Sequence, residues 1–270
     1  MITIIKTEFL KLKRYNIILS GIFMMLLSVV LTIFTSTAND GSFWDFRYLY
    51  EQVIKNNMTL IFPVCITLIS GYIMNREYEN DTMKNILTVP ISYKKLVFCK
   101  LIVCGVVSIL FGFCCFVFTI IGEKVMNYTG FTVKYAIEAL FSITANSLFL
   151  YIATMPIIVL SWRKQKGYLV GAIAAFVYGY SGLLASSKMA LANIYPITAS
   201  LGLIGYRNYD ISVNWNIGLN ITSMTLMILL SILITIKFNI NLDNSKRKRK
   251  RLKQKKDGKI YYKDKLFLVF

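Results

Sequence analysis

The chain has 270 residues, a net charge of +18 and no histidine, and 56% of its residues are hydrophobic, with a mean hydropathy of +0.57. The apolar share of soluble globular domains is usually just under one half. The composition therefore excludes a soluble globular domain and indicates an integral membrane protein.

Long apolar windows recur at the length that an α-helix needs to cross about 30 Å of hydrocarbon. They predict an all-α integral membrane protein with six transmembrane helices, at 16–38, 56–75, 97–122, 139–162, 167–187 and 211–236. Loops are expected at 39–55 and 123–138. The first window carries no small-residue cleavage pattern, so we expect a retained anchor and not a signal peptide.

Residues 1–15 precede the first window and have their own apolar pattern. On a helix, one face would carry Ile2, Ile5, Phe9 and Leu12. Lys6, Glu8 and Lys13 would lie elsewhere on the helix. The pattern predicts an amphipathic helix in the inner membrane interface. The alternative is an extension that only flanks the first span.

Basic residues predict the orientation of the chain, because Lys and Arg near the ends of spans favour the cytoplasmic side. With six spans and cytoplasmic N- and C-termini, 25 of the 31 Lys and Arg residues fall inside. The basic residues left outside are Arg47, Lys55, Lys124, Lys134, Lys188 and Arg207. Any arrangement that puts the basic tail outside is strongly disfavoured.

Residues 189–206 also lack charged residues, but a seventh full span would carry the basic tail to the outside. Pro196, Gly202 and Gly205 interrupt this segment. We therefore expect a re-entrant or surface-lying outer element between the fifth and sixth spans. Irregular backbone is tolerated at membrane depth where protein buries it.

Groups that carry chemistry are scarce. The nearest fragment to a phosphate-binding loop, Gly258-Lys259, lacks the upstream glycine and the hydroxyl residue. The predicted spans contain no acidic residue and no histidine, which disfavours an intramembrane enzyme, a metal site or a proton-coupled transporter. The five cysteines lie within or at the edge of spans and are expected to be apolar fillers. The sequence predicts a chain that is not an enzyme and binds no cofactor itself.

The segment 76–95 separates the second and third predicted spans and combines charged with apolar residues. Its side chains at helical spacing are Tyr78, Thr82, Met83, Ile86 and Leu87. Asn80 or Asp81 can cap a short helix, and Pro90 ends it. Exposed apolar residues on such a helix favour a docking element for a partner protein. The alternative, a charged loop that only sets topology, is equally compatible with the periodicity.

The residues of this segment resemble the cytoplasmic loop of ABC-2-type permeases, in particular the bacitracin-resistance and lantibiotic-immunity permeases. The resemblance lies in Arg76-Glu77-Tyr78, Thr82-Met83-Lys84, Ile86-Leu87-Thr88-Val89-Pro90-Ile91-Ser92 and Lys100. The run Glu8, Lys11, Leu12, Lys13 and Arg14 is similar to the family's opening. The chain departs from the family at Tyr93, where many relatives carry an arginine after Pro-x-Ser.

The resemblance implies a coupling helix that seats in a cleft of a separately encoded ATPase. The implied ATPase-coupling residues are Arg76, Glu77, Tyr78, Glu79, Thr82, Met83, Ile86, Leu87 and Pro90. It implies an elbow helix that uses Ile5, Phe9 and Leu12. ATP and magnesium would bind to the ATPase, present in two copies, beside a homodimer or a sister permease.

The function implied by the resemblance is export of a peptide antibiotic of bacitracin or lantibiotic type from the cell membrane, in a multi-pass protein of bacterial origin. The residues themselves support only an amphiphilic cargo. Analogy with the family suggests a transport path near Tyr178, Tyr180 and Ser181, and Asn146 is added because its amide needs a partner at membrane depth. The alternative function is a membrane scaffold or sensor that docks a signalling protein, and a neighbouring reading frame with a phosphate loop would discriminate the two.

The tail, 237–270, contains the run SKRKRKRLKQKK at 245–256. Attraction to anionic lipid of the inner leaflet explains this run, at about 1 kcal/mol per basic residue near the surface. A nucleic-acid arm is disfavoured because the run lacks interleaved aromatic residues and follows a span directly.

Overall fold

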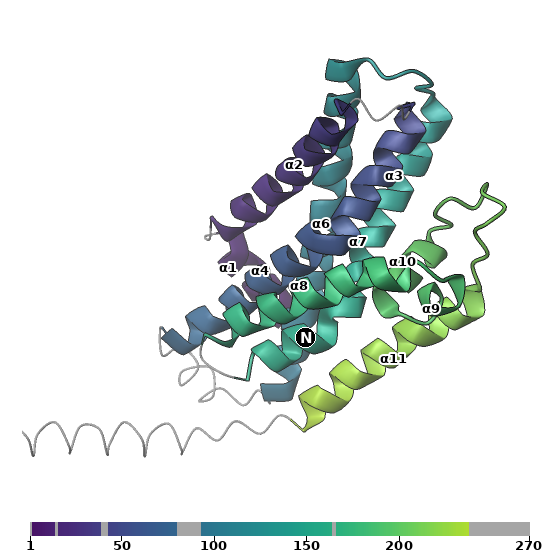
Figure 1. Ribbon diagram of the computed structural model, residues 1–270. Coiled ribbons are helices and arrows are strands. Elements are labelled where there is room, and N and C mark those ends of the chain that lie inside the picture. The colour runs from purple at the N-terminus through teal and green to yellow at the C-terminus, as the bar shows by residue number, and fades with distance from the viewer. Residues whose placement is uncertain (1, 14–15, 39–42, 80–92, 164–165, 238–270) are drawn as a thin grey trace, which may run out of the picture. The chain divides into compact units, whose positions relative to one another are not determined.

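The computed structural model describes residues 2–13, 16–38, 43–79, 93–163 and 166–237. In these ranges the regular structure is helical (Figure 1). The elements are α1 (Ile2–Lys13), α2 (Ile17–Ser36), α3 (Phe46–Asn56), the π-helical turn η1 (Asn57–Ile61), α4 (Phe62–Glu79), α6 (Tyr93–Met126), α7 (Val133–Ser161), α8 (Gly167–Ala185), α9 (Met189–Ala192), α10 (Pro196–Leu203) and α11 (Ile217–Ile236).

Six helical segments of the described chain are long and apolar enough to cross a membrane. They are Ile17–Ser36, Phe46–Arg76, Lys94–Met126, Val133–Ser161, Gly167–Ala185 and Ile217–Ile236. The predicted all-α architecture with six spans is confirmed. The cytoplasmic position of the termini stays a prediction.

The loop expected at 39–55 is wrong from Phe46 onward, because α3 begins there and continues through η1 into α4. Asp45 caps α3 by accepting a hydrogen bond from the Tyr48 amide at 2.7 Å. The charged residues Arg47 and Glu51 interrupt the apolar window, but the helix buries an apolar face through Leu49, Val53 and Ile54. The loop expected at 123–138 is likewise shorter, with α6 ending at Met126 and α7 beginning at Val133.

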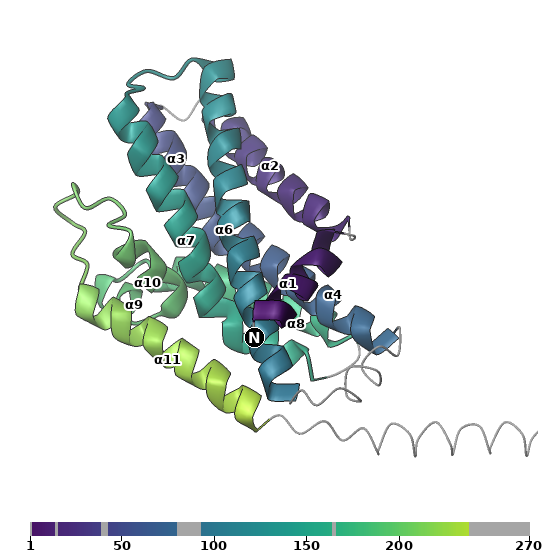
Figure 2. The ribbon, with the colours of Figure 1, turned by 180° about the vertical axis from the view of Figure 1, so that it is seen from behind.

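The helices pack around the segment formed by α3, η1 and α4, which is the most buried of the six spans. Helix α6 packs along α7 and α2, α4 packs along α8, and α11 packs along α7 (Figures 1 and 2). Helix α11 is the least buried span, so most of its side chains face outward. Residues 189–206 form α9 and α10, and α10 packs on α7 and α11.

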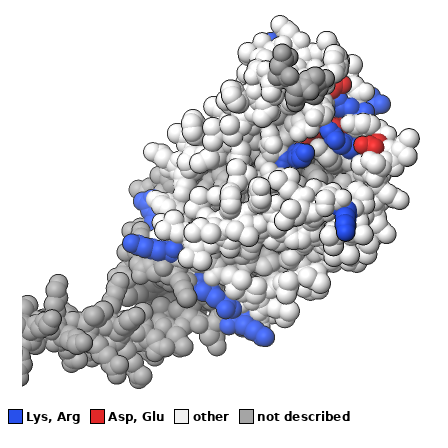
Figure 3. Space-filling view, in the orientation of Figure 1, with Lys and Arg blue, Asp and Glu red and all other residues white. Residues whose placement is uncertain are grey.

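Figure 1 shows the last turns of α2 and α6 and the first turns of α3 and α7 together at one end of the helices, and the end of α4 and the start of α6 towards the other. We call the first end the predicted outer face, following the charge pattern. The Phe46 amide donates to the Thr129 carbonyl at 3.0 Å on this face, which joins the start of α3 to the α6–α7 connection. Figure 3 shows basic and acidic side chains together at one end of the visible face.

Candidate functional site

Helix α1 is held on α6 by a buried ion pair. The Lys100 Nζ lies 2.5 Å from Glu8 Oε2, and the two residues are 1% and 3% exposed. The Lys11 Nζ approaches Glu8 Oε1 at 2.6 Å. Burial alone raises the pKa of Glu8, but the two lysines outweigh it, so this pKa is lowered from its ordinary value of 4.5. Glu8 is therefore charged at neutral pH, and α1 is anchored to α6 by charge.

The buried face of α1 differs from the predicted one at Glu8. Leu12 is buried and Ile5 is half-buried, whereas Phe9 is exposed. Glu8 was expected away from the apolar face, but it shares the buried face with Ile5 and Leu12, its neighbours at helical spacing. The expectation is wrong because the Lys100 ammonium lies opposite and compensates the carboxylate.

The two helices that flank the segment 80–92 are each tied to other parts of the protein. Near the end of α4, the Asn75 side chain accepts a hydrogen bond from the Lys166 amide at 2.8 Å, and the Ser70 carbonyl accepts one from Trp162 Nε1 at 3.1 Å. On α6, the Tyr151 hydroxyl of α7 donates to the Leu101 carbonyl at 2.6 Å. Each flank of the segment therefore contacts α7 or the α7–α8 connection.

The predicted coupling residues lie partly outside the described residues. Thr82, Met83, Ile86, Leu87 and Pro90 fall in the range that the structure leaves undescribed. The backbone of Glu77, Tyr78 and Glu79 forms the last turn of α4. The Arg76 Nη1 donates to the Tyr72 hydroxyl at 3.3 Å, on the same helix. The docking role of all nine residues stays a prediction.

A polar junction interrupts the central span where α3 passes into η1. The Asn56 amide donates to Thr32 Oγ1 of α2 at 2.8 Å, and the Asn57 amide lies 3.1 Å from the Cys115 Sγ of α6. Single π-helical turns inside α-helices are frequent at functional sites. These contacts place polar groups from three helices at one level of the helical core.

A glycine of α8 lies against the same junction. Pro63 has no N–H, so the Thr59 carbonyl lacks its ordinary helical donor. A Cβ on Gly179 would lie 2.5 Å from that carbonyl oxygen, so only glycine allows this approach of α8 to η1. No local pattern in the sequence indicates this contact between α8 and η1.

The residues suggested for a transport path do not all meet. The Ser181 hydroxyl donates to the Tyr178 carbonyl at 2.9 Å and bonds the Tyr195 hydroxyl at 2.5 Å, and the Tyr178 and Tyr195 ring centroids are 5.2 Å apart. Tyr180 points the other way, is 55% exposed and stacks on Phe176. Asn146 is buried on α7, and its Oδ1 accepts no hydrogen bond from the described residues. Their role in transport stays a prediction.

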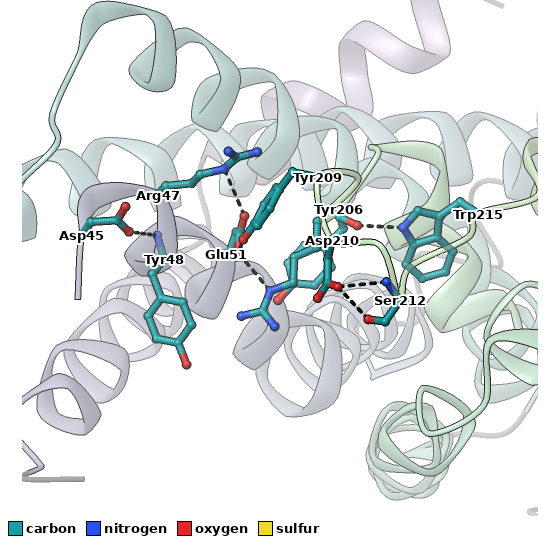
Figure 4. A network of polar contacts seen from close by, with 10 residues as sticks. Asp45, Arg47, Tyr48, Glu51, Tyr206, Tyr209, Asp210, Ser212 and Trp215 are labelled. Atoms are coloured by element: carbon teal, nitrogen blue, oxygen red, sulfur yellow. Dashed lines mark hydrogen bonds and ion pairs between the residues drawn. The ribbon is translucent and has the colours of Figure 1, made fainter. Parts of the chain in front are cut away.

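Sequence reasoning missed a charged cluster on the predicted outer face, which we call the Glu51 cluster: Arg47, Glu51, Arg207 and Tyr209. Glu51 is 2% exposed. Its Oε2 accepts hydrogen bonds from Arg207 Nε at 3.0 Å and from the Tyr209 hydroxyl at 2.9 Å, and its Oε1 lies 3.5 Å from Arg47 Nε (Figure 4). The local signal was the spacing of Arg47 and Glu51 on one helical face.

The cluster fixes the turn between α10 and α11 on α3. Arg207 has a left-handed backbone, with φ of 52°, which is uncommon for a residue with a side chain. The Arg47 guanidinium carbon lies 3.7 Å from the centroid of the Tyr209 ring. Burial and the hydrogen bond to Glu51 raise the pKa of Tyr209, so its phenol remains a donor at neutral pH. Side chains from α3 and from the turn between α10 and α11, which are distant in sequence, thus contact the Glu51 carboxylate.

The described residues contain no group of three or more His, Cys, Asp and Glu that could hold a metal ion. Four of the five cysteines are buried, and all five are free thiols. In the described part of the chain, buried polar groups join neighbouring helices, and some line a pocket on α3.

Six spanning helices with buried polar junctions define a multi-pass helical membrane protein. The family model described as "ABC-2 family transporter protein" matches residues 4–182, from α1 into α8, and the chain belongs to this family. The chain is also similar to the bacitracin transport permease protein BCRB from Bacillus licheniformis. The two are 27% identical over 146 residues, which cover 49% of this chain and 70% of that protein.

Proposed function

We propose that this chain is the permease subunit of an ATP-driven exporter in a bacterial cell membrane, and that it removes amphiphilic peptide antibiotics of bacitracin or lantibiotic type. Two copies of a separate ATPase would bind and hydrolyse ATP with magnesium, beside a second copy of this chain or a sister permease. Membership of the ABC-2 transporter family and the similarity to a bacitracin transport permease support this proposal.

The attachment of α6 is the observation that carries the proposal. Helix α6 begins directly after the segment 80–92 and continues without interruption for 34 residues. The Glu8–Lys100 ion pair joins its first part to α1, and the Tyr151 hydrogen bond joins it to α7. A force applied by an ATPase to the segment would therefore move α1, α6 and α7 together, as rigid-body transitions require.

ATP binding would act on this permease by shifting its population between two states. Closure of the ATPase pair would displace the segment 76–95, and the helices attached to α6 would rearrange around the central span. We expect the central span to bend at the polar junction at η1 during this rearrangement, because π-helical turns and proline weaken the regular hydrogen bonding of a helix.

Co-purification with the ATPase from the neighbouring reading frame tests the proposal. We expect the wild-type chain to retain the ATPase and stimulate its activity in lipid. The variant Leu87→Asp places a charge on an apolar position of the segment and should lose both effects. The variant Asn85→Asp introduces the same charge at a polar position and is the matched control. Failure of the wild-type chain to bind any ATPase would contradict the proposal and favour a scaffold or sensor.

A further inference from the structure

A pocket of about 390 Å³ adjoins the Glu51 cluster, between α3, α7 and the turn that follows α10. Its charged lining residues are Arg47, Glu51, Glu138 and Arg207. Small-molecule sites usually have volumes of roughly 300–1,000 Å³ and combine apolar walls with a few placed polar groups. The volume and the lining of this pocket therefore suit a ligand and not only a structural ion pair.

The four charges of the pocket are unequally satisfied. Arg207 and Tyr209 supply the hydrogen bonds to Glu51, with Arg207 at 3.0 Å. Arg47 is left with a looser contact of 3.5 Å, and its buried Nε makes no hydrogen bond in the described part of the chain. Figure 4 shows that its terminal nitrogens point away from Glu51. Arg47 also shares a side-chain hydrogen bond with Tyr50, but a guanidinium has five N–H donors, so Arg47 keeps donors for a further ligand.

Glu138 is the second acidic residue that lines the pocket. It lies on α7, is half-buried and faces the same pocket. Among the described residues no ion pair joins it to Arg47. Tyr50 lines the same pocket, so the pocket wall combines a cation, an anion and an aromatic side chain. Aromatic rings beside a carboxylate favour ammonium groups, and an arginine favours phosphate.

The remaining wall of the pocket is apolar and leads outward. Ile137 and Phe141 are 51% and 67% exposed, and their spacing puts them on the same face of α7. Ile137 and Phe141 are next to one another on a helix long and apolar enough to cross a membrane. A hydrocarbon chain could therefore follow this face while its polar end reaches the charges.

From these observations we propose that the pocket binds the zwitterionic head group of a membrane amphiphile, with the phosphate on Arg47, the ammonium on Glu138 and the hydrocarbon tail along Ile137 and Phe141. A singly charged head group would leave one of the two protein charges without a partner, at a cost in free energy. Assignment of the ligand as cargo rests on the proposed function, whereas binding itself does not.

The experiment measures binding of the full chain in non-ionic maltoside micelles by native mass spectrometry, without ATPase or nucleotide. The probes are dodecylphosphocholine, dodecyl methyl phosphate and dodecyltrimethylammonium, which share one tail, and phosphocholine, which has none. Dodecyl methyl phosphate is a phosphate diester with one negative charge, like the phosphate of dodecylphosphocholine. We expect the zwitterionic probe to bind about tenfold more tightly than either singly charged probe, as one extra ion pair of about 1.4 kcal/mol gives. Phosphocholine without a tail should bind more weakly than all three.

Two variants test each charge separately. Glu138→Gln should abolish the preference over dodecyl methyl phosphate, and Arg47→Gln should abolish the preference over dodecyltrimethylammonium. Lys55→Gln and Asp210→Asn remove charges that do not line the pocket, and they should keep the wild-type ratios. Each ratio is measured within one variant, so a smaller folded fraction does not imitate the effect.

Equal binding of the three tailed probes, a preference for a singly charged probe, or unchanged ratios in both variants would overturn the inference. Phosphocholine binding as tightly as dodecylphosphocholine would also overturn it, because the site would then take a free head group and no amphiphile. Loss of ATPase association with intact probe binding would contradict only the proposed function.

Discussion

Removal of one partner from the Glu8–Lys100 ion pair should release α1 from α6. Glu8 is 3% exposed and Lys100 is 1% exposed, so Glu8→Gln leaves a buried ammonium without its carboxylate. Breaking a buried pair in this way costs roughly 3–5 kcal/mol. Lys100→Gln should cost less, because Lys11 still lies 2.6 Å from the carboxylate of Glu8.

Amide hydrogen exchange of residues 2–13 in lipid nanodiscs measures this release directly, because it reports local opening. A cost of about 3 kcal/mol corresponds to roughly a hundredfold loss of protection for α1. The double variant Glu8→Gln/Lys100→Met removes both charges and should recover most of the protection. Equal protection in the wild type and the Glu8→Gln variant would refute the view that this ion pair holds α1.

Three further predictions concern other contacts. Because the pKa of Glu8 is lowered, the ion pair stabilises α1 fully above pH 4.5 and is lost as the pH falls below that value. The amide hydrogen exchange of α1, corrected for intrinsic rates, should therefore be constant from neutral pH to about 5. It should rise only in more acidic buffer. Gly179→Ala should lower the free energy of unfolding by about 1–3 kcal/mol, because the new Cβ would lie 2.5 Å from the Thr59 carbonyl oxygen. The control variant Gly218→Ala, whose Cβ would have its nearest contact at 3.3 Å, should change it little. Equal melting temperatures of the two variants would contradict the packing of α8 on η1. Arg207→Gln should speed exchange in residues 204–213, and unchanged exchange there would show that the Arg207–Glu51 contact does not hold this turn.

Hydropathy predicts the number of spans correctly because crossing a bilayer requires long apolar helices whatever their tertiary contacts. It fails at α3 because it treats a charged residue as incompatible with a span. Arg47 and Glu51 are tolerated there since Arg207, 156 residues further along the chain than Glu51, compensates the buried carboxylate. No local pattern contains that distant partner.

Helical periodicity predicts α1 but misplaces its buried face for the same reason. Helical spacing places Glu8 beside Ile5 and Leu12, but its charge predicts exposure, and only the contact with Lys100, 92 residues away, makes its burial favourable. The sequence also does not predict which side chains of Tyr178, Tyr180 and Ser181 lie together. Tyr178 and Ser181 meet Tyr195, whereas Tyr180 lies on the exposed face of α8.

For the segment 76–95, the sequence is more informative than the structure. Its residues were identified by resemblance to a family, and the family match over residues 4–182 agrees with that resemblance. Positions 80–92 lie outside the described residues, so the structure adds only the flanking helices and their attachments. The coupling role stays a prediction that the Leu87→Asp variant tests.

ATP-dependent movement of cargo tests the central claim most directly. The chain would be reconstituted with its neighbouring ATPase in proteoliposomes, and fluorescently labelled bacitracin would be followed across the membrane with ATP and with a non-hydrolysable analogue. Transport that requires hydrolysis and fails in the Leu87→Asp variant is the predicted result. Equal peptide distribution with and without hydrolysis, in vesicles where both chains are assembled, would contradict the account.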